Sequence, residues 1–283
     1  MYEARLKRLI SALAGASLEA VAAIAGPNLY YLTGLSFHLS ERPTVGFFPA
    51  HADPVIVAGS LEESKIKAGA PYPVRSFVYT DADGPADAFA AAARALILGK
   101  GRLGVEGRRM RVMELQLIKA AFPSLQIGPA EEVFAALRMI KDEREIEMMR
   151  QATRIAEKAL AATLPKIRVG MTEREVATEL VVETLRAGSD AELPFAPIVA
   201  SGPNSALPHA FVTDRVIAKG DLLTLDWGAA TGGYFSDLTR TFVVGAAGEG
   251  EVEAELKTIY DLVKAANAAG KAAAKPGATC ASV

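Results

Sequence analysis

The segment that most constrains this chain carries two aspartates, Asp226 and Asp237, between two short runs of β-type residues. The first run alternates in polarity, and the second is rich in Thr, Phe and Val, as strands are. An Ala-Ala-Thr-Gly-Gly turn signal separates them. A hairpin centred between Thr231 and Gly232 would set the two aspartates directly opposite each other, with Cβ atoms about 4.5–5.5 Å apart on one face.

Two ionised carboxylates at that distance repel each other by roughly 3 kcal/mol at an effective dielectric constant near 20. A shared proton, a basic side chain or a bound metal ion would compensate this repulsion. The alternative is an exposed hairpin with two solvated aspartates. Asp is disfavoured inside strands, so its place within two apolar or β-branched runs argues against that alternative. Counting with a period of two puts four more residues on this face: Thr224, Phe235, Thr239 and Thr241. The threonines among them are suited to orienting the carboxylates.

The composition of the 283-residue chain excludes several classes of protein. Hydrophobic residues make up 51% and charged residues 23%, which is typical of a globular protein. A formal net charge of −2 gives no electrostatic reason to bind nucleic acid or an anionic membrane. The apolar stretch from Ala86 to Leu98 is too short and too polar to span a bilayer. With one cysteine, Cys280, and no visible secretory signal, we expect a cytoplasmic protein without internal disulfides.

Strands and helices alternate in the first half of the chain, which is typical of an α/β domain. A change in composition near Ile127-Gly-Pro predicts a boundary, with one domain over residues 1–130 and a second over residues 137–283. The predicted helices of the first domain cover residues 2–14, 62–68, 85–98 and 110–121, and its predicted strands cover residues 20–25, 44–49, 54–58 and 103–106.

The second domain is predicted to begin with a long amphipathic helix. A capping box, Thr172-Glu-Arg-Glu175, starts the next helix. A short strand at Ala210–Thr213 is then predicted before the hairpin, and an amphipathic helix over residues 251–275 ends the series, with Val252, Leu256, Ile259 and Val263 facing inward.

Of the three histidines, His209 is the candidate for chemistry. His38 and His51 lie in loop-like segments of the first domain, where surface or packing roles are expected. His209 ends an apolar segment that starts at Pro194 and is punctuated by Pro and Gly. It is suited to moving protons or to hydrogen-bonding a substrate carbonyl. The alternative is a structural histidine with satisfied hydrogen bonds.

Four motifs together resemble the pita-bread metallopeptidases, and within them the Xaa-Pro peptidases, prolidase and aminopeptidase P. They are Leu137-Arg-Met-Ile-Lys-Asp-Glu-Arg-Glu-Ile, Pro197-Ile-Val-Ala-Ser-Gly-Pro-Asn-Ser-Ala-Leu-Pro-His, Gly220-Asp-Leu-Leu-Thr-Leu-Asp-Trp-Gly and Ser236-Asp-Leu-Thr-Arg-Thr-Phe. A fifth, Pro27-Asn-Leu-Tyr-Tyr-Leu-Thr-Gly34, looks like part of a creatinase-type N-terminal domain. The resemblance covers nearly the whole chain. It implies an α+β protein, with a creatinase-type α/β N-terminal domain followed by a pita-bread domain.

The resemblance also implies a function, a homodimeric exopeptidase that cleaves the Xaa-Pro bond of peptides or dipeptides through a metal-activated water. In that family two Asp, one His and two Glu hold two divalent metal ions, and Asp226 and Asp237 match the two aspartates. His209 matches the histidine that binds substrate and moves protons, and Phe195 falls where the family shapes its substrate pocket. The sequence does not decide between Mn, Co and Zn, nor between dipeptides and longer peptides as substrates.

One departure from the family pattern concerns the remaining ligands. In the family the histidine ligand and both glutamate ligands follow the final helix, and this chain stops at Val283 before any of them. We therefore expect a shortened form with an incomplete pita-bread domain, no ordered pair of metal ions and no peptidase activity by itself. We also expect its open sheet edge to be covered by another chain or by self-association.

Two other functions remain open from the sequence. One is a creatinase-like hydrolase that works without metal, and the other is a non-catalytic pita-bread module that binds peptides or proteins. The retained aspartate pair argues against both, because neither function needs it.

Overall fold

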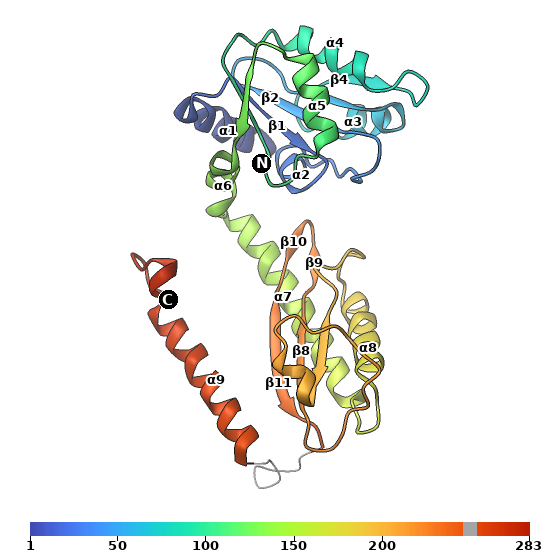
Figure 1. The fold of residues 1–283 in the computed structure, drawn as a ribbon, viewed down its shortest axis with the longest axis vertical. Coiled ribbons are helices and arrows are strands. Elements are labelled where there is room, and N and C mark those ends of the chain that lie inside the picture. Colours follow the sequence, from blue (N-terminus) through green and yellow to red (C-terminus); the bar gives the residue numbers. More distant parts are fainter. Residues whose placement is uncertain (246–253) are drawn as a thin grey trace. The chain divides into compact units, whose positions relative to one another are not determined.

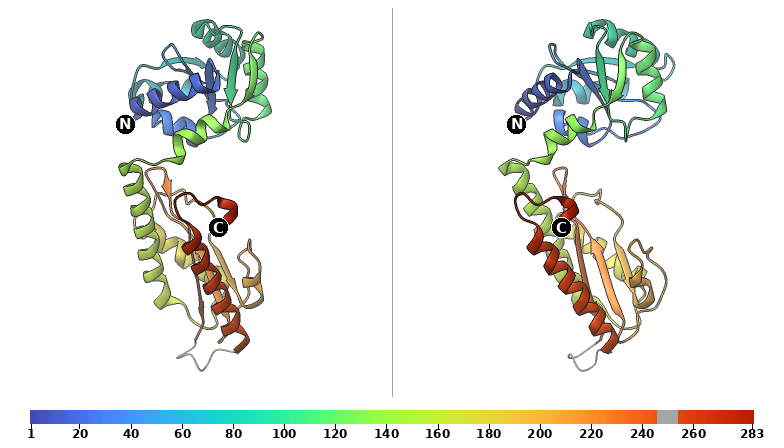
Figure 2. Two further views of the ribbon diagram at one scale, coloured as in Figure 1. Left: turned by 90° about the vertical axis from the view of Figure 1, so that its left-hand side faces the viewer. Right: turned by 60° about the vertical axis from the view of Figure 1, so that its left-hand side comes forward.

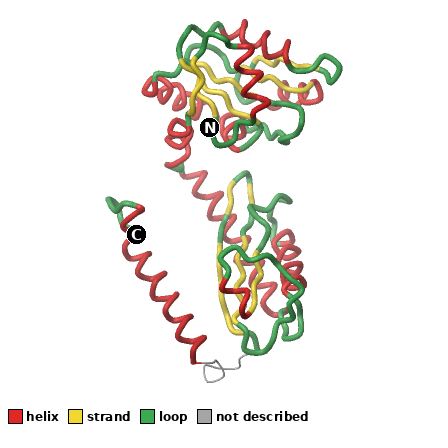
Figure 3. Tube along the Cα trace, in the orientation of Figure 1, coloured by secondary structure: helices red, strands yellow, loops and turns green. Residues whose placement is uncertain are grey.

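The computed structural model describes residues 1–245 and 254–283, and it divides into two compact units, Met1–Lys141 and Asp142–Val283 (Figure 1). Each unit is built around its own main sheet (Figure 3). Among the described residues, no helix combines the length and the apolar character needed to cross a bilayer.

The first unit contains a six-stranded mixed sheet in the order β4-β3-β2-β1-β5-β6. Strands β1, β2 and β3 pair antiparallel, whereas β3–β4, β1–β5 and β5–β6 pair parallel. The elements of this unit are α1 (Tyr2–Ala16), β1 (Ala20–Ile24), α2 (Pro27–Thr33), β2 (Val45–Pro49), β3 (Val55–Gly59), α3 (Glu63–Gly69), β4 (Arg75–Tyr79), α4 (Ala86–Leu96), β5 (Arg102–Val105), α5 (Val112–Ala121), β6 (Gln126–Pro129) and α6 (Glu131–Met139).

Helices cover both faces of this sheet (Figure 2). Successive residues of β1 point to opposite faces, so Val21 and Ala23 join one core while Ala22 and Ile24 join the other. Helices α1, α2, α3 and α6 pack on the first face, and α4 and α5 pack on the second. Every residue of β1 is buried, as expected for a central strand covered on both sides.

The second unit contains a three-stranded antiparallel sheet in the order β11-β8-β7, with a two-stranded extension, β10-β9. Helices α7 and α8 cover one face of the larger sheet. The elements of this unit are α7 (Glu143–Thr163), α8 (Glu173–Arg186), β7 (Ile198–Ser201), β8 (Leu222–Trp227), β9 (Ala230–Thr231), β10 (Tyr234–Phe235), β11 (Leu238–Val243) and α9 (Ala254–Ala273), with short 3-10 turns at Leu164–Lys166, Gly202–Ala206 and Cys280–Ser282. The first unit has a 3-10 turn at Ser60–Glu62.

The hairpin that carries the aspartates is attached to α7 by side-chain hydrogen bonds. The indole Nε1 of Trp227 donates to the carbonyl of Ala156 at 3.1 Å. The hydroxyl of Ser236 donates to the carbonyl of Ala152 at 3.1 Å. Near the start of the helix, Tyr234 donates to the carboxylate of Glu145 at 2.8 Å.

Helix α8 begins as predicted. The Thr172 hydroxyl accepts from the backbone N–H of Glu175, and the Glu175 side chain accepts from the backbone N–H of Thr172. This reciprocal pair is the capping box that the sequence indicated.

The predicted strand at Ala210–Thr213 is wrong, because residues 211–215 form no ladder. The backbone N–H of Thr213 donates instead to the side chain of Glu173 at 3.1 Å, and only Val216 makes an isolated bridge, to Thr172. The buried carboxylate of Glu173 thus accepts the hydrogen bond that the Thr213 N–H would have donated to a neighbouring strand.

The inward side predicted for the last helix is also wrong where the structure describes it. Ile259 and Val263 are exposed, Leu256 is half-buried, and Val252 lies outside the described residues. Helix α9 buries none of its residues, so the amphipathic pattern identified a helix but not a packing partner.

The tightest point of the hairpin gives a stability prediction. A Cβ at Gly228 would lie 2.0 Å from the backbone oxygen of Ser236. Gly228→Ala should therefore force the two strands apart and lower the stability of the second unit by about 1–3 kcal/mol, as overpacking does. Urea unfolding followed by circular dichroism measures this loss.

Gly270→Ala is the matched control, because a Cβ there would meet nothing within 4 Å. It stands within α9, so alanine should be neutral or stabilising by roughly 0.5–1 kcal/mol. Equal unfolding midpoints for the two variants would contradict the close approach at Gly228.

Candidate metal centre

Asp226 occupies the middle strand of the three-stranded sheet. Its register partners are Ile198 on β7 and Thr239 on β11. The side chains that alternate with it on β8, Leu225 and Trp227, are buried against the helices. Asp226 therefore stands on the opposite face of the sheet, away from α7 and α8.

The register of the hairpin differs by two residues from the predicted one. Asp226 lies opposite Thr239 rather than opposite Asp237. The turn is Gly232-Gly233, with φ of 57° and 82°, so the centre falls between these glycines. A tight hairpin turn needs positive φ at both central residues. Gly accepts this freely, whereas β-branched Thr231 does not, which is why the predicted centre was wrong.

The shifted register keeps the aspartates on one face. Asp237 precedes Thr239 by two residues, so it is the diagonal neighbour of Asp226, and such neighbours remain within reach of each other. The threonines predicted for this face are placed there by the pairing. The hydroxyls of Thr224 and Thr241 lie 3.0 Å apart, and Thr239 stands directly opposite Asp226, where its side chain acts to lower the pKa of the Asp226 carboxyl.

The charge of Asp226 is poorly compensated by the chain. Its Oδ1 is buried and accepts no hydrogen bond from any described residue. Burial and the nearby charge of Asp237 raise the pKa of Asp226, against the opposing effects of the Thr239 side chain and the charge of His209. A buried carboxylate oxygen without a donor, beside a second carboxylate, is the arrangement that a divalent cation relieves. The two aspartates therefore fit a metal site.

His209 lies in the connection between β7 and β8. Its side chain is exposed, and its charge acts on Asp226, so the structure brings these two predicted residues together. Within residues 1–245 and 254–283, no group of three or more His, Cys, Asp and Glu side chains is arranged to share a metal ion.

Phe195 is half-buried in the segment that leads into β7. Its neighbour Pro194 approaches the hairpin, because a Cβ at Gly228 would lie 2.8 Å from the Cγ of Pro194. The segment of Phe195 thus passes close to the strand that bears Asp226.

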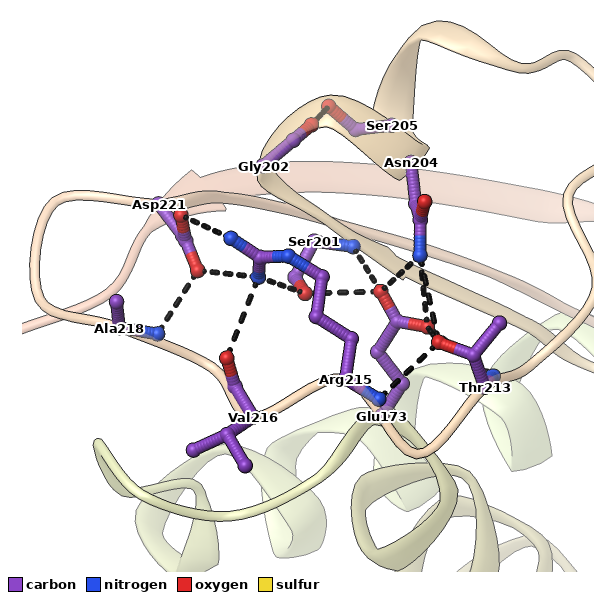
Figure 4. A network of polar contacts seen from close by, with 10 residues as sticks. All are labelled: Glu173, Ser201, Gly202, Asn204, Ser205, Thr213, Arg215, Val216, Ala218 and Asp221. Atoms are coloured by element: carbon purple, nitrogen blue, oxygen red, sulfur yellow. Dashed lines mark hydrogen bonds and ion pairs between the residues drawn. The ribbon is translucent and has the colours of Figure 1, made fainter.

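One polar cluster beside this site was not predicted from the sequence. Glu173, Ser201, Thr213, Arg215 and Asp221 form a connected network around the connection that holds His209 (Figure 4). The capping box marked only the flanking positions of Glu173. The pairing of these residues depends on a loop path that no periodicity encodes.

Two family models match the two units of the chain. Residues 5–140 match the Creatinase/Prolidase N-terminal domain, and residues 147–283 match Metallopeptidase family M24. These matches, together with the likeness to a solved prolidase structure, confirm the fold expected from the sequence.

Among individual proteins, the chain is 33% identical over 284 residues to an Xaa-Pro dipeptidase of Pyrococcus horikoshii, covering 97% of this chain and 72% of that protein. It is 39% identical over 181 residues to an uncharacterized peptidase, YqhT, of Bacillus subtilis, covering 64% of this chain and 50% of that protein. Its structure resembles that of a prolidase from Thermococcus sibiricus, with a TM-score of 0.86 at 29% identity over 95% of this chain and 71% of that one.

The electrostatics of Asp226 give a prediction for the protein stripped of metal by a chelator. Below pH 3.8, the ordinary pKa of this carboxyl, Asp226 is protonated in both the folded and unfolded states. Because the folded pKa is raised, stability is lost as the pH rises through it. Asp226→Asn should therefore raise the melting temperature near pH 7, by roughly 2–4 °C per kcal/mol relieved, and the gain should vanish near pH 3.

Asp237→Asn is the comparison variant for this melting experiment. Asp237 is exposed, so its replacement relieves the repulsion but not the cost of burial, and we expect a smaller gain. A lower melting temperature for Asp226→Asn at pH 7 would mean that the chain already compensates this charge.

Proposed function

This chain belongs to the M24 metallopeptidases with a creatinase/prolidase-type N-terminal domain, and we propose that it is a metal-dependent exopeptidase that cleaves the Xaa-Pro bond of peptides or dipeptides. The observation that carries this proposal is the pair Asp226 and Asp237 on one sheet face, with the buried Oδ1 of Asp226 lacking a donor among the described residues. The similar Xaa-Pro dipeptidase and prolidase supply the class of substrate.

We propose Asp226 and Asp237 as metal ligands. Thr239 stands directly opposite Asp226 in the register of the hairpin, so its hydroxyl is placed to orient the Asp226 carboxylate, as ligand-supporting groups do at metal sites. When bound, the divalent ions would supply an acidified water and a Lewis acid for the scissile carbonyl. Two carboxylates are hard oxygen ligands, which favours Mn among the metals considered.

His209 is proposed to bind the substrate and to move protons. It is exposed on its connection, and its charge acts on Asp226, so a substrate held at the aspartates lies within its electrostatic range. Protonated, it donates to the substrate carbonyl, and neutral, it accepts a proton from a reacting group. Phe195, which is half-buried in the neighbouring segment, is proposed to line the substrate pocket.

The two aspartates also bear on the rival functions. A metal-free hydrolase or a binding module would have no use for two carboxylates that raise each other's energy. Metal content of the full-length gene product separates these possibilities directly. The homodimer expected from the sequence stays a prediction.

The roles of Asp226 and His209 predict different outcomes in one assay of the full-length gene product with Mn²⁺. Asp226→Asn should lower kcat/KM for an Xaa-Pro dipeptide more than roughly 100-fold, beyond the loss typical of groups that only support a ligand. It should also lower bound metal, measured by mass spectrometry. His209→Ala should lower kcat by roughly 10²–10⁴-fold, the contribution of a proton-transfer group, with bound metal unchanged.

His51→Ala is the matched control for the histidine, because His51 is exposed in the first unit. It should change neither kinetics nor metal content. The same dipeptide with Ala in place of Pro tests the substrate class. Loss of metal in His209→Ala, or equal turnover of the Pro and Ala substrates, would contradict these assignments.

We further propose that residues 1–283 alone do not turn over substrate. Asp226 and Asp237 provide two ligands, whereas catalytic zinc-type sites use at least three from the protein. The test compares residues 1–283 with the full-length gene product on the Xaa-Pro dipeptide with added Mn²⁺. Equal activity would show that the ligands have been assigned to the wrong part of the protein.

A further inference from the structure

One fully buried carboxylate in the second unit is not among the residues proposed to bind metal or substrate. Glu173 is the first residue of α8 and is 0% exposed. Glutamate is almost never fully buried unless it is paired, and leaving such a charge unsatisfied is costly. The helix start does not need it, because Thr172 and Glu175 already form the capping box.

The partners of Glu173 lie at the two ends of the segment that carries His209 (Figure 4). Before His209, Ser201 donates to Oε1 through its backbone N–H at 2.7 Å and its hydroxyl at 2.8 Å, and the amide of Asn204 donates at 3.1 Å. After His209, Thr213 donates to Oε2 through its backbone N–H at 3.1 Å and its hydroxyl at 2.5 Å. One carboxylate thus holds both ends of the segment.

A second branch of the network leads to the strand of the metal centre. Arg215 Nη1 donates to the hydroxyl of Ser201 at 2.6 Å. The same guanidinium makes a two-pronged pair with Asp221, with Nη1–Oδ2 at 2.6 Å and Nη2–Oδ1 at 3.0 Å. Asp221 directly precedes β8, which bears Asp226. The contacts therefore run without a break from Glu173 to the start of that strand.

The glycine within this network supports the same conclusion. Gly202 has φ of 50°, and a Cβ there would lie 2.6 Å from Arg215 Nη2 and 2.8 Å from Asp221 Oδ1. The chain turns at Gly202 in the left-handed region, which suits glycine, and the turn leaves room for the guanidinium. The path of the segment and the ion pair therefore depend on each other.

We propose that Glu173 is a positioning residue, which fixes where His209 stands relative to Asp226 by binding both ends of the segment that carries it. This inference rests on the role proposed for His209. Glu173 meets five donor groups, and an ionised carboxylate, which only accepts, suits all of them. Glutamine of the same shape would turn its NH₂ group against some of these donors.

The chemical state of Glu173 is consistent with this role. Burial opposes its ionisation, but the hydrogen bonds from Thr213 and Ser201 outweigh burial and hold the pKa of the Glu173 carboxyl below its usual value. The carboxylate stays charged, and able to accept, at every pH at which a histidine works.

The first test is structural and does not depend on activity. Hydrogen–deuterium exchange of the full-length gene product is followed in peptides from residues 202–213. Glu173→Gln should raise exchange in this segment. Glu175→Gln, the same change two residues along the helix, should not, because the capping hydrogen bonds of Glu175 within the described residues are made with Thr172 and glutamine serves equally in a capping box.

The second test is a double-mutant cycle on the Xaa-Pro dipeptidase assay. Glu173→Gln should lower kcat by about 10–100-fold, the cost of misplacing a catalytic group by about 1 Å, with bound Mn²⁺ unchanged. In the His209→Ala background the same change should have no further effect, because residues that act through one another are not additive. Thr213→Val removes one of the donors to Glu173, so it should also lower kcat, by a smaller factor. If Glu173→Gln does not fold, Thr213→Val takes its place in both tests.

The outcomes separate this inference from the proposed function. Unchanged exchange at residues 202–213 overturns the anchoring role whether or not the enzyme cleaves Xaa-Pro bonds. Losses that add in the double mutant overturn action through His209. Raised exchange without any peptidase activity in the parent protein supports the anchor and counts against the proposed function alone.

Discussion

The poorly compensated charge of Asp226 is the constraint on which our account of the second unit depends. A strand residue whose neighbours Leu225 and Trp227 are buried brings a carboxylate to the other face of the sheet. There its Oδ1 accepts no hydrogen bond from the described residues, and Asp237 adds a second negative charge. A chain that folded for stability alone would avoid this pair. The metal site proposed for the pair would account for it, because a divalent cation would relieve the repulsion between the two carboxylates.

Much of the second unit holds this carboxylate in place. The Gly232-Gly233 turn fixes the register of the hairpin, and Trp227 and Ser236 attach the hairpin to successive turns of α7. The connection that carries His209 is fixed by different means. It lacks regular secondary structure around the histidine, and its ends are held by the buried side chain of Glu173. The regular backbone of the hairpin thus places the proposed metal ligands, and a polar network holds the segment of the histidine proposed to bind the substrate.

The sequence predicted those parts of the structure that local rules determine. The capping box at Thr172, the alternating strand at Asp226 and the α/β character of the first unit follow from side-chain spacing, and the structure agrees. The hairpin register was wrong by two residues, because apolar patterning is satisfied by either register and the two φ values of the turn decide between them. The strand expected at Ala210–Thr213 was wrong for another reason. Its donor at Thr213 binds a side chain forty residues away in sequence, which no local pattern reveals.

The central claim is that Asp226 and Asp237 share a divalent cation, and the most direct measurement is an anomalous-difference map at the manganese edge from crystals of the full-length gene product grown with Mn²⁺. Our account predicts a peak within about 2.0–2.2 Å of an oxygen of each carboxylate, with the Oδ1 of Asp226 among the ligands. The claim would be contradicted by a map that has no peak at the two aspartates and in which Asp226 instead shares a proton with Asp237 or pairs with a basic side chain.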